Sequence, residues 1–175
     1  MNLQLIFVVE SNSKCKSDWI YIKDTIERFY NFDNAHVRLT PVYMDGKGNY
    51  KKKQKEVLQW IGQYSATVKD GISKVIYCFD CDDYDVNPED ICFLNNVQQY
   101  CKQQNYDFVW FCKDIERVYI GKKVDDSKKK DEATKFKTKK LIKKVDCKKL
   151  ISRNYKLNTS NIMNVLDTHL CRKES

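Results

Sequence analysis

The chain has 175 residues, a formal net charge of +8 and eight cysteines. This length suffices for a single domain with its own hydrophobic core, so disulfides and a structural metal are not needed for stability. No apolar run reaches the length of a membrane-spanning helix, so we expect no membrane association. Because the opening residues MNLQLIFVVE predict a strand rather than a secretory signal, we expect a cytoplasmic protein with reduced thiols.

Strands and helices are predicted to alternate through the first two thirds of the chain. Short β-branched or aromatic runs predict the strands, and apolar residues three or four positions apart predict the helices. The expected strands are 3–9, 36–44, 75–79 and 106–112, and the expected helices are 17–30, 51–68 and 88–104. Such alternation is typical of βαβ units. We therefore expect the α/β class, with a Rossmann-like, about four-stranded parallel sheet covered by helices.

The pattern weakens after Gly121. Residues 122–140 have no clean periodicity and predict a loop or a marginal helix, whereas 158–170 predicts a closing helix capped by Thr159 or Ser160. We expect an α/β domain over 1–121, with a lysine-rich extension and terminal helix over 122–175 that pack on the same domain.

The positive charge is concentrated in that extension. Residues 122–149 contain 13 lysines and five acidic residues, and the rest of the chain is neutral. A localised basic segment is typical of a surface that faces a polyanion. A solvated, partly disordered lysine-rich loop is the alternative interpretation.

Acidic residues follow three of the predicted strands. Glu10 follows the first, Asp80 and Asp82 follow the third, and Asp114 and Glu116 follow the fourth. Because parallel strands bring their carboxyl ends to one edge of the sheet, we expect these acids to gather there. In an extended strand, Asp80 and Asp82 would point to the same side and bind one hard cation together. A solvated turn or a helix N-terminus is the alternative role for each.

Three segments together resemble the Toprim domain, the fold shared by topoisomerase and primase catalytic domains and by OLD-family nucleases. The segments are LIFVVES with Glu10, VIYCFDCDD with Asp80 and Asp82, and VWFCKDIERVYIG with Glu116. The resemblance covers roughly residues 3–121, and the small size is closest to the RloB-type proteins of phage-defence loci. The Toprim pattern usually has a glycine soon after its glutamate, whereas Ser11–Ser13 stand here.

The resemblance implies a nuclease that hydrolyses phosphodiesters of DNA or RNA with Mg²⁺ or Mn²⁺, as the effector of an antiviral defence system. It implies that Asp80 and Asp82 hold the cation, that Glu10 is a ligand or general acid/base, and that Glu116 binds a second ion. Lysines would neutralise the phosphates, and the candidates are Lys47, Lys128, Lys129, Lys130, Lys139 and Lys140. An ATPase or sensor partner and a homodimer stay open.

Other classes of protein stay open as well. A non-catalytic module that binds nucleic acid or a partner would explain the basic segment, with the acids as remnants. A phosphatase of the haloacid-dehalogenase type also uses D-x-D, with its first Asp as nucleophile, but carries that motif on its first strand. Cys78 and Cys81 form a single C-x-x-C, and without a second pair this is weak evidence for zinc.

Overall fold

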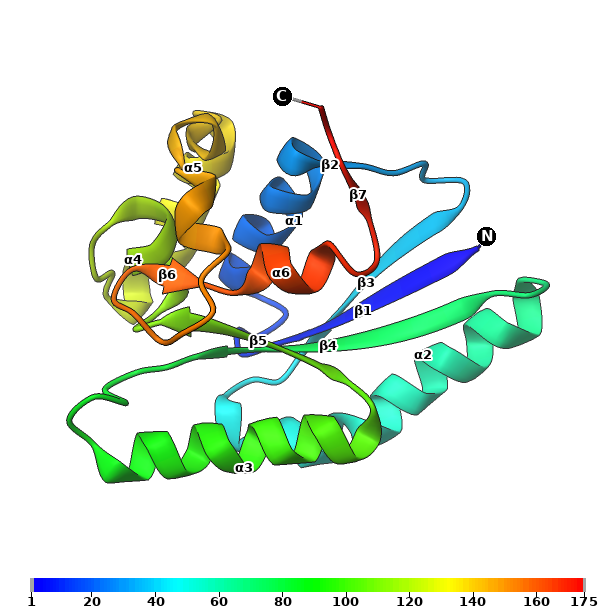
Figure 1. Cartoon of the computed structure of the whole chain (residues 1–175), viewed down its shortest axis with the longest axis horizontal. Coiled ribbons are helices and arrows are strands. Elements are labelled where there is room, and N and C mark those ends of the chain that lie inside the picture. The colour runs from blue at the N-terminus through cyan, green and yellow to red at the C-terminus, as the bar shows by residue number, and fades with distance from the viewer. Residues whose placement is uncertain (1, 175) are drawn as a thin grey trace.

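The structure is a computed structural model, and it describes residues 2–174 (Figure 1). Its strands and helices alternate as the sequence predicts, and the α/β class is confirmed. In chain order they are β1 (Leu3–Val9), α1 (Ser17–Phe29), β2 (Tyr30–Asn31), β3 (Val37–Tyr43), α2 (Gln54–Thr67), β4 (Ile72–Asp80), α3 (Pro88–Gln104), β5 (Asp107–Cys112), α4 (Ile115–Ile120), α5 (Lys129–Thr138), β6 (Thr159–Ser160), α6 (Ile162–Leu166) and β7 (Cys171–Arg172).

The main sheet has five strands in the order β3-β1-β4-β5-β6. The first four are parallel, which agrees with the predicted four-stranded parallel sheet. The fifth strand, β6, is an addition, and it pairs antiparallel with the end of β5. The sheet is therefore mixed but mostly parallel, and the carboxyl ends of four strands meet at one edge.

Helices cover both faces of this sheet (Figure 1). All seven residues of β1 are buried, and its six apolar residues divide between two apolar clusters. Leu5 and Phe7 pack with α1, α4, α5 and α6, whereas Ile6 and Val8 pack with α2 and α3. Burial on both faces explains why β1 is apolar from Leu5 to Val9 rather than alternating. No helix within residues 2–174 is long and apolar enough to cross a membrane.

The lysine-rich extension is more ordered than the sequence predicts. Residues 129–138 form the helix α5, which packs on α1 through Ala133 and Phe136, both fully buried. The Phe136 ring meets the Tyr21 ring edge-on, with ring centroids 4.8 Å apart. Two apolar residues are too few to give a helical period in the sequence, so tertiary packing decides the structure here.

The closing helix is much shorter than the predicted 158–170. Thr159 and Ser160 pair with β5 as β6 instead of capping a helix, and α6 contains only Ile162–Leu166. The exposed edge of β5 would otherwise leave backbone groups without partners, and β6 satisfies them. A smaller difference occurs at α2, which begins at Gln54 rather than at residue 51, and a 3₁₀-helix over Lys47–Lys53 precedes it.

Candidate functional site

Glu10 and Asp80 lie side by side at the carboxyl edge of the sheet. Glu10 directly follows β1, and Asp80 is the last residue of the neighbouring parallel strand β4. The Oε1 atom of Glu10 accepts a 2.8 Å hydrogen bond from the backbone N–H of Asp80. The parallel sheet thus brings together two acids that are distant in the sequence.

The start of α4 fixes the orientation of Asp80. The Oδ1 atom of Asp80 accepts a 2.9 Å hydrogen bond from the backbone N–H of Ile115, the first residue of α4. Asp114 has a different role, because its carboxylate caps this helix by accepting a 2.8 Å bond from the N–H of Arg117. Of the acids after β5, Asp114 therefore has the structural role that its place before a helix suggests.

Asp18 is a third acid at this edge. Its Oδ2 atom accepts a 2.8 Å hydrogen bond from the backbone N–H of Ser11, and its Oδ1 atom accepts a 3.1 Å bond from the Ser17 hydroxyl. Sequence reasoning missed Asp18, which lies in the first turn of α1, where an acid also favours the helix N-terminus. The helix that follows a parallel strand begins at the edge where that strand ends. The position of Asp18 in the first turn of α1 could therefore have identified it as a residue of this site.

These acids line a pocket of about 420 Å³, which we call the acidic pocket. Its charged lining residues are five acids and a single lysine. They are Glu10, Asp18, Asp45, Asp80, Asp126 and Lys129. A surface with so many carboxylates in a small volume favours a cation or bound protons over the fully ionised state.

Burial and mutual repulsion alter the acidity of the two central carboxyls. Burial raises the pKa of Glu10 to about 8, and the charges of Asp18 and Asp82 act in the same direction. Burial also raises the pKa of Asp80 well above its ordinary value, with further contributions from Glu10 and Asp18. Perturbed carboxyls that face a pocket are typical of functional sites rather than of solvated turns.

Glu116 lies beside this cluster in α4 and is completely buried. Within residues 2–174, neither of its carboxylate oxygens has a hydrogen-bond partner. Burial raises the pKa of Glu116 to about 7, and the positive charge of Lys129 opposes that rise. Although burial disfavours the charged form of Lys129, the charges of Glu116 and Asp80 hold the pKa of this lysine above its usual range. Lys129 is thus the cation of the acidic pocket.

Asp82 does not lie with Asp80 in this structure. The strand ends at Asp80, and Asp82 has a left-handed backbone with φ of 49°. Its Oδ2 atom forms a 2.5 Å ion pair with Lys47, whose Nζ atom also contacts Asp90 at 2.9 Å. The strand alternation expected to place Asp80 and Asp82 on one side therefore stops between them. Lys47, expected to contact phosphates, pairs with these two acids in the structure.

A cation site is not fully assembled in the structure. Among the residues described, no group of three or more His, Cys, Asp or Glu side chains is arranged to hold a metal ion. Glu10, Asp80 and Asp18 nevertheless supply the carboxylate oxygens that Mg²⁺ and Mn²⁺ prefer. Burial first, and then the charges of neighbouring acids, raise the pKa values of Glu10 and Asp80, so both carboxyls favour protonation unless a cation stabilises their charged form. The donor set therefore fits a divalent cation, with Asp82 available if Lys47 releases it.

A zinc site at the C-x-x-C pair, for which the sequence is weak evidence, has no support in the geometry. Cys78 and Cys81 lie in different apolar clusters on opposite faces of the sheet. The nearest sulfur to Cys81 is instead that of Cys112, 3.0 Å away at the end of β5. All eight cysteines are free, as expected of a chain with reduced thiols.

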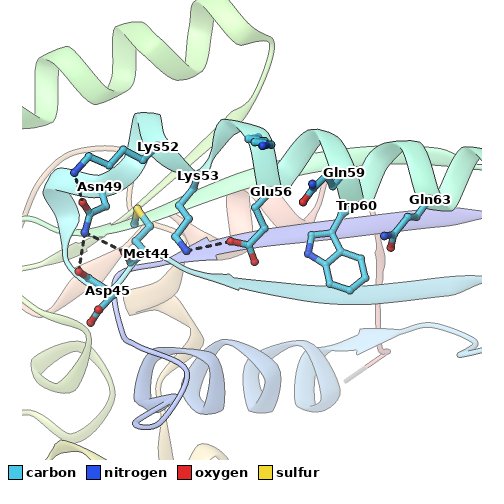
Figure 2. Close-up of a pocket in the computed structure, with 10 residues that line it drawn as sticks. Met44, Asp45, Asn49, Lys52, Lys53, Glu56, Gln59, Trp60 and Gln63 are labelled. Atoms are coloured by element: carbon cyan, nitrogen blue, oxygen red, sulfur yellow. Dashed lines mark hydrogen bonds and ion pairs between the residues drawn. The ribbon is translucent and has the colours of Figure 1, made fainter.

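A second, wider pocket lies along α2 and shares Asp45 with the acidic pocket (Figure 2). Its volume is about 790 Å³, and Trp60 and three lysines line it. Lys53 pairs with Glu56 at 3.0 Å, and Lys52 donates to Asn49 at 3.2 Å. We call it the α2 pocket. Its charges are nearly balanced, so it is a weaker candidate for a polyanion site.

No protein-family model, no curated protein and no solved structure matches this chain. Function is therefore inferred from the acidic pocket and from the surfaces beside it. The fold that positions this site is a helix-covered, mostly parallel α/β sheet.

Proposed function

We propose that this chain is a divalent-metal-dependent nuclease of the Toprim type that hydrolyses phosphodiester bonds. The observation that carries the proposal is the pairing of Glu10 with Asp80 at adjacent strand ends, in one pocket with Asp18. Of the four acids at the exit of β4, Asp82 pairs with Lys47, and Asp83 and Asp85 pair with Lys113, so Asp80 is the one left for a cation to neutralise. The lysine-rich helix α5 contributes Lys129 to the same pocket.

The proposed cation ligands are the adjacent Glu10 and Asp80, and Asp18 is a further carboxylate in the same pocket. A bound Mg²⁺ or Mn²⁺ would polarise the scissile phosphate and lower the pKa of an attacking water. The backbone N–H of Asp80 holds Glu10, and the N–H of Ile115 holds Asp80, so the two carboxylates are oriented before any ligand binds. Such pre-oriented groups lose little freedom when the reaction begins.

Lys129 is the proposed phosphate contact in this site. It is the basic residue that lines the acidic pocket, and the 3.2 Å ion pair with Asp126 holds its ammonium there. The charges of Glu116 and Asp80 keep this lysine protonated. A fixed positive charge at this position would attract the phosphate and stabilise the additional negative charge of the transition state.

A non-catalytic nucleic-acid-binding module is the second candidate. The observation in its favour is the ion pair between Asp82 and Lys47, which removes one of the two D-x-D carboxylates from a shared cation. In that case the acids would serve only to complete the turn after β4. The two candidates differ in whether the acidic pocket binds a divalent cation.

The test is cleavage of single-stranded and duplex DNA and RNA with Mg²⁺, Mn²⁺ or EDTA. We expect metal-dependent cleavage by the wild type and its loss in Glu10→Gln and Asp80→Asn. Asp83→Asn is the matched control, because Asp83 lies in the same loop but pairs with Lys113 at the surface. Metal-dependent cleavage that survives in both pocket variants would overturn the proposed site, and its absence from the wild type would favour the binding module.

A further inference from the structure

A basic groove lies between α1 and α5, next to the acidic pocket. Its first part has a volume of about 490 Å³, and its second part, of about 280 Å³, shares Asp24 and Lys137 with the first. We call the two parts together the α1–α5 groove. The basic residues that line it are Lys14, Lys16, Lys23, Arg28, Lys130, Lys137, Lys140 and Lys143.

The positive charge of this groove is almost uncompensated. Eight basic residues face two acids, Asp24 and Glu27. Among the residues described, Lys23 alone of these eight forms an ion pair, with Glu27 at 3.6 Å. Other lysines of the extension, away from the groove, are paired with nearby acids: Lys122, Lys128, Lys129 and Lys135. The unpaired lysines thus gather where α1 and α5 meet.

Repulsion among so many exposed lysines destabilises the fold unless a polyanion neutralises them. The groove runs beside α1, whose 13 residues extend over about 20 Å. A chain of phosphates fits such a track better than one small anion, because charges along its whole length are then matched. The predominance of lysine favours phosphate contacts over reading of base edges.

Trp19 gives this groove a feature that would favour single-stranded over duplex nucleic acid. It lines the first part of the groove and is partly exposed. Its ring packs against Phe7 with centroids 5.4 Å apart, so the indole has a fixed position. An aromatic ring beside a basic groove can stack on an unpaired base, whereas the bases of a duplex are already stacked on each other.

We propose that the α1–α5 groove binds a single-stranded polynucleotide and leads its backbone into the acidic pocket. The two regions adjoin each other at Cys15, which lines both of them. The consecutive residues Lys129 and Lys130 face the acidic pocket and the groove, respectively. Delivery to the acids rests on the proposed nuclease function, but binding in the groove does not.

The α2 pocket supplies a matched comparison. It also combines a tryptophan with lysines and adjoins the acidic pocket through Asp45 (Figure 2). Its three lysines face two acids, so its net charge is small. Charge reversal at Lys52 and Lys55 therefore changes the total charge by the same amount as reversal at Lys16 and Lys130, but at a different surface.

The experiment measures binding of labelled 20-nucleotide oligo(dT), oligo(U) and a DNA duplex by fluorescence anisotropy in EDTA. We expect both single strands to bind more tightly than the duplex. Lys16→Glu/Lys130→Glu should weaken binding at least tenfold and reduce its salt dependence, whereas Lys52→Glu/Lys55→Glu should change it less than threefold. The preferred single strand then identifies DNA or RNA as the substrate.

Tryptophan fluorescence tests the stacking part. Oligo(dT) should quench the emission of wild type and Trp60→Phe, and Trp19→Phe should lose most of that quenching. Equal weakening by the two lysine pairs, or a duplex that binds as tightly as the single strands, would overturn the proposal. The two proposals can fail separately. Because binding is measured in EDTA, a wild type that does not bind single strands would refute the groove and leave the metal-dependent nuclease untouched. A wild type that binds single strands but cleaves none of them with metal would refute the nuclease and leave the groove.

Discussion

The acidic pocket and the α1–α5 groove share Cys15, yet they are built in opposite ways. The pocket takes its acids from strand ends and a first helical turn, and backbone amides orient them. The groove takes its lysines from exposed helix faces and leaves most of them unpaired. Fixed, buried groups suit chemistry at one bond, and exposed charges on long side chains suit binding along a polymer. Damage to one region should therefore spare the other.

The largest expected effect separates cleavage from binding. Asp80→Asn should reduce metal-dependent cleavage about 1000-fold, because it removes a charged ligand that the N–H of Ile115 orients. Oligo(dT) binding in EDTA should stay within about threefold of wild type, since the groove lysines are unchanged. A gel assay and anisotropy on the same samples measure both. A parallel loss of both would show that the two regions are one functional unit.

The next effect concerns the packing that forms the groove. Phe136→Ala should lower the free energy of unfolding by about 3–5 kcal/mol, because the Phe136 ring is completely buried against Tyr21. Chemical denaturation measures this loss. Phe136→Leu, which keeps most of the apolar volume, should cost less than half as much. Equal stability of wild type and Phe136→Ala would mean that α5 is not held on the core.

A smaller effect tests the burial of Glu116. Its pKa rises to about 7 on folding, so between pH 4.5 and 7 the folded state binds more protons than the unfolded state. Stability in EDTA should therefore fall as the pH rises through this window, by about 3 kcal/mol from this group. Glu116→Gln should remove that part of the difference in unfolding free energy between pH 5 and pH 8. An unchanged pH dependence would contradict the buried, unpaired carboxyl.

The smallest effect tests the role of Lys47. Lys47→Met frees Asp82 and removes a positive charge near Glu10. We expect Mn²⁺ to bind this variant about tenfold more tightly, because one more carboxylate becomes available to the cation. Isothermal titration calorimetry measures the change. Lys113→Met is the control, since Lys113 pairs with the outer acids Asp83 and Asp85.

The edge of the sheet could be predicted from the sequence because its strands are short apolar runs. β1 ends at Val9 as predicted, and α3 has the predicted bounds, which Pro88 and the Asn87 cap determine. Once β1 and β4 are known to be parallel neighbours, Glu10 and Asp80 must lie at the same edge. Local composition and one rule of sheet topology are thus enough to predict that Glu10 and Asp80 lie together.

The rest depends on contacts that composition does not encode. The positive φ of Asp82 ends the strand pattern early, and no alternation rule predicts the ion pair with Lys47. The helix α5 depends on the buried residues Ala133 and Phe136, and the Phe136 ring packs against Tyr21 of α1. The groove, in turn, exists only because α5 packs on α1, so its lysines could be counted in the sequence but not assigned to one surface.

The most direct test of the central claim is a thermal melt with and without Mn²⁺. Wild type and Asp83→Asn should gain about 5–10 °C at saturating Mn²⁺, because a cation that binds only the folded state stabilises it. Glu10→Gln and Asp80→Asn should gain less than about 2 °C. That pattern would place the cation on the acidic pocket. The same gain in all four proteins, or no gain in wild type, would contradict a metal site formed by Glu10 and Asp80.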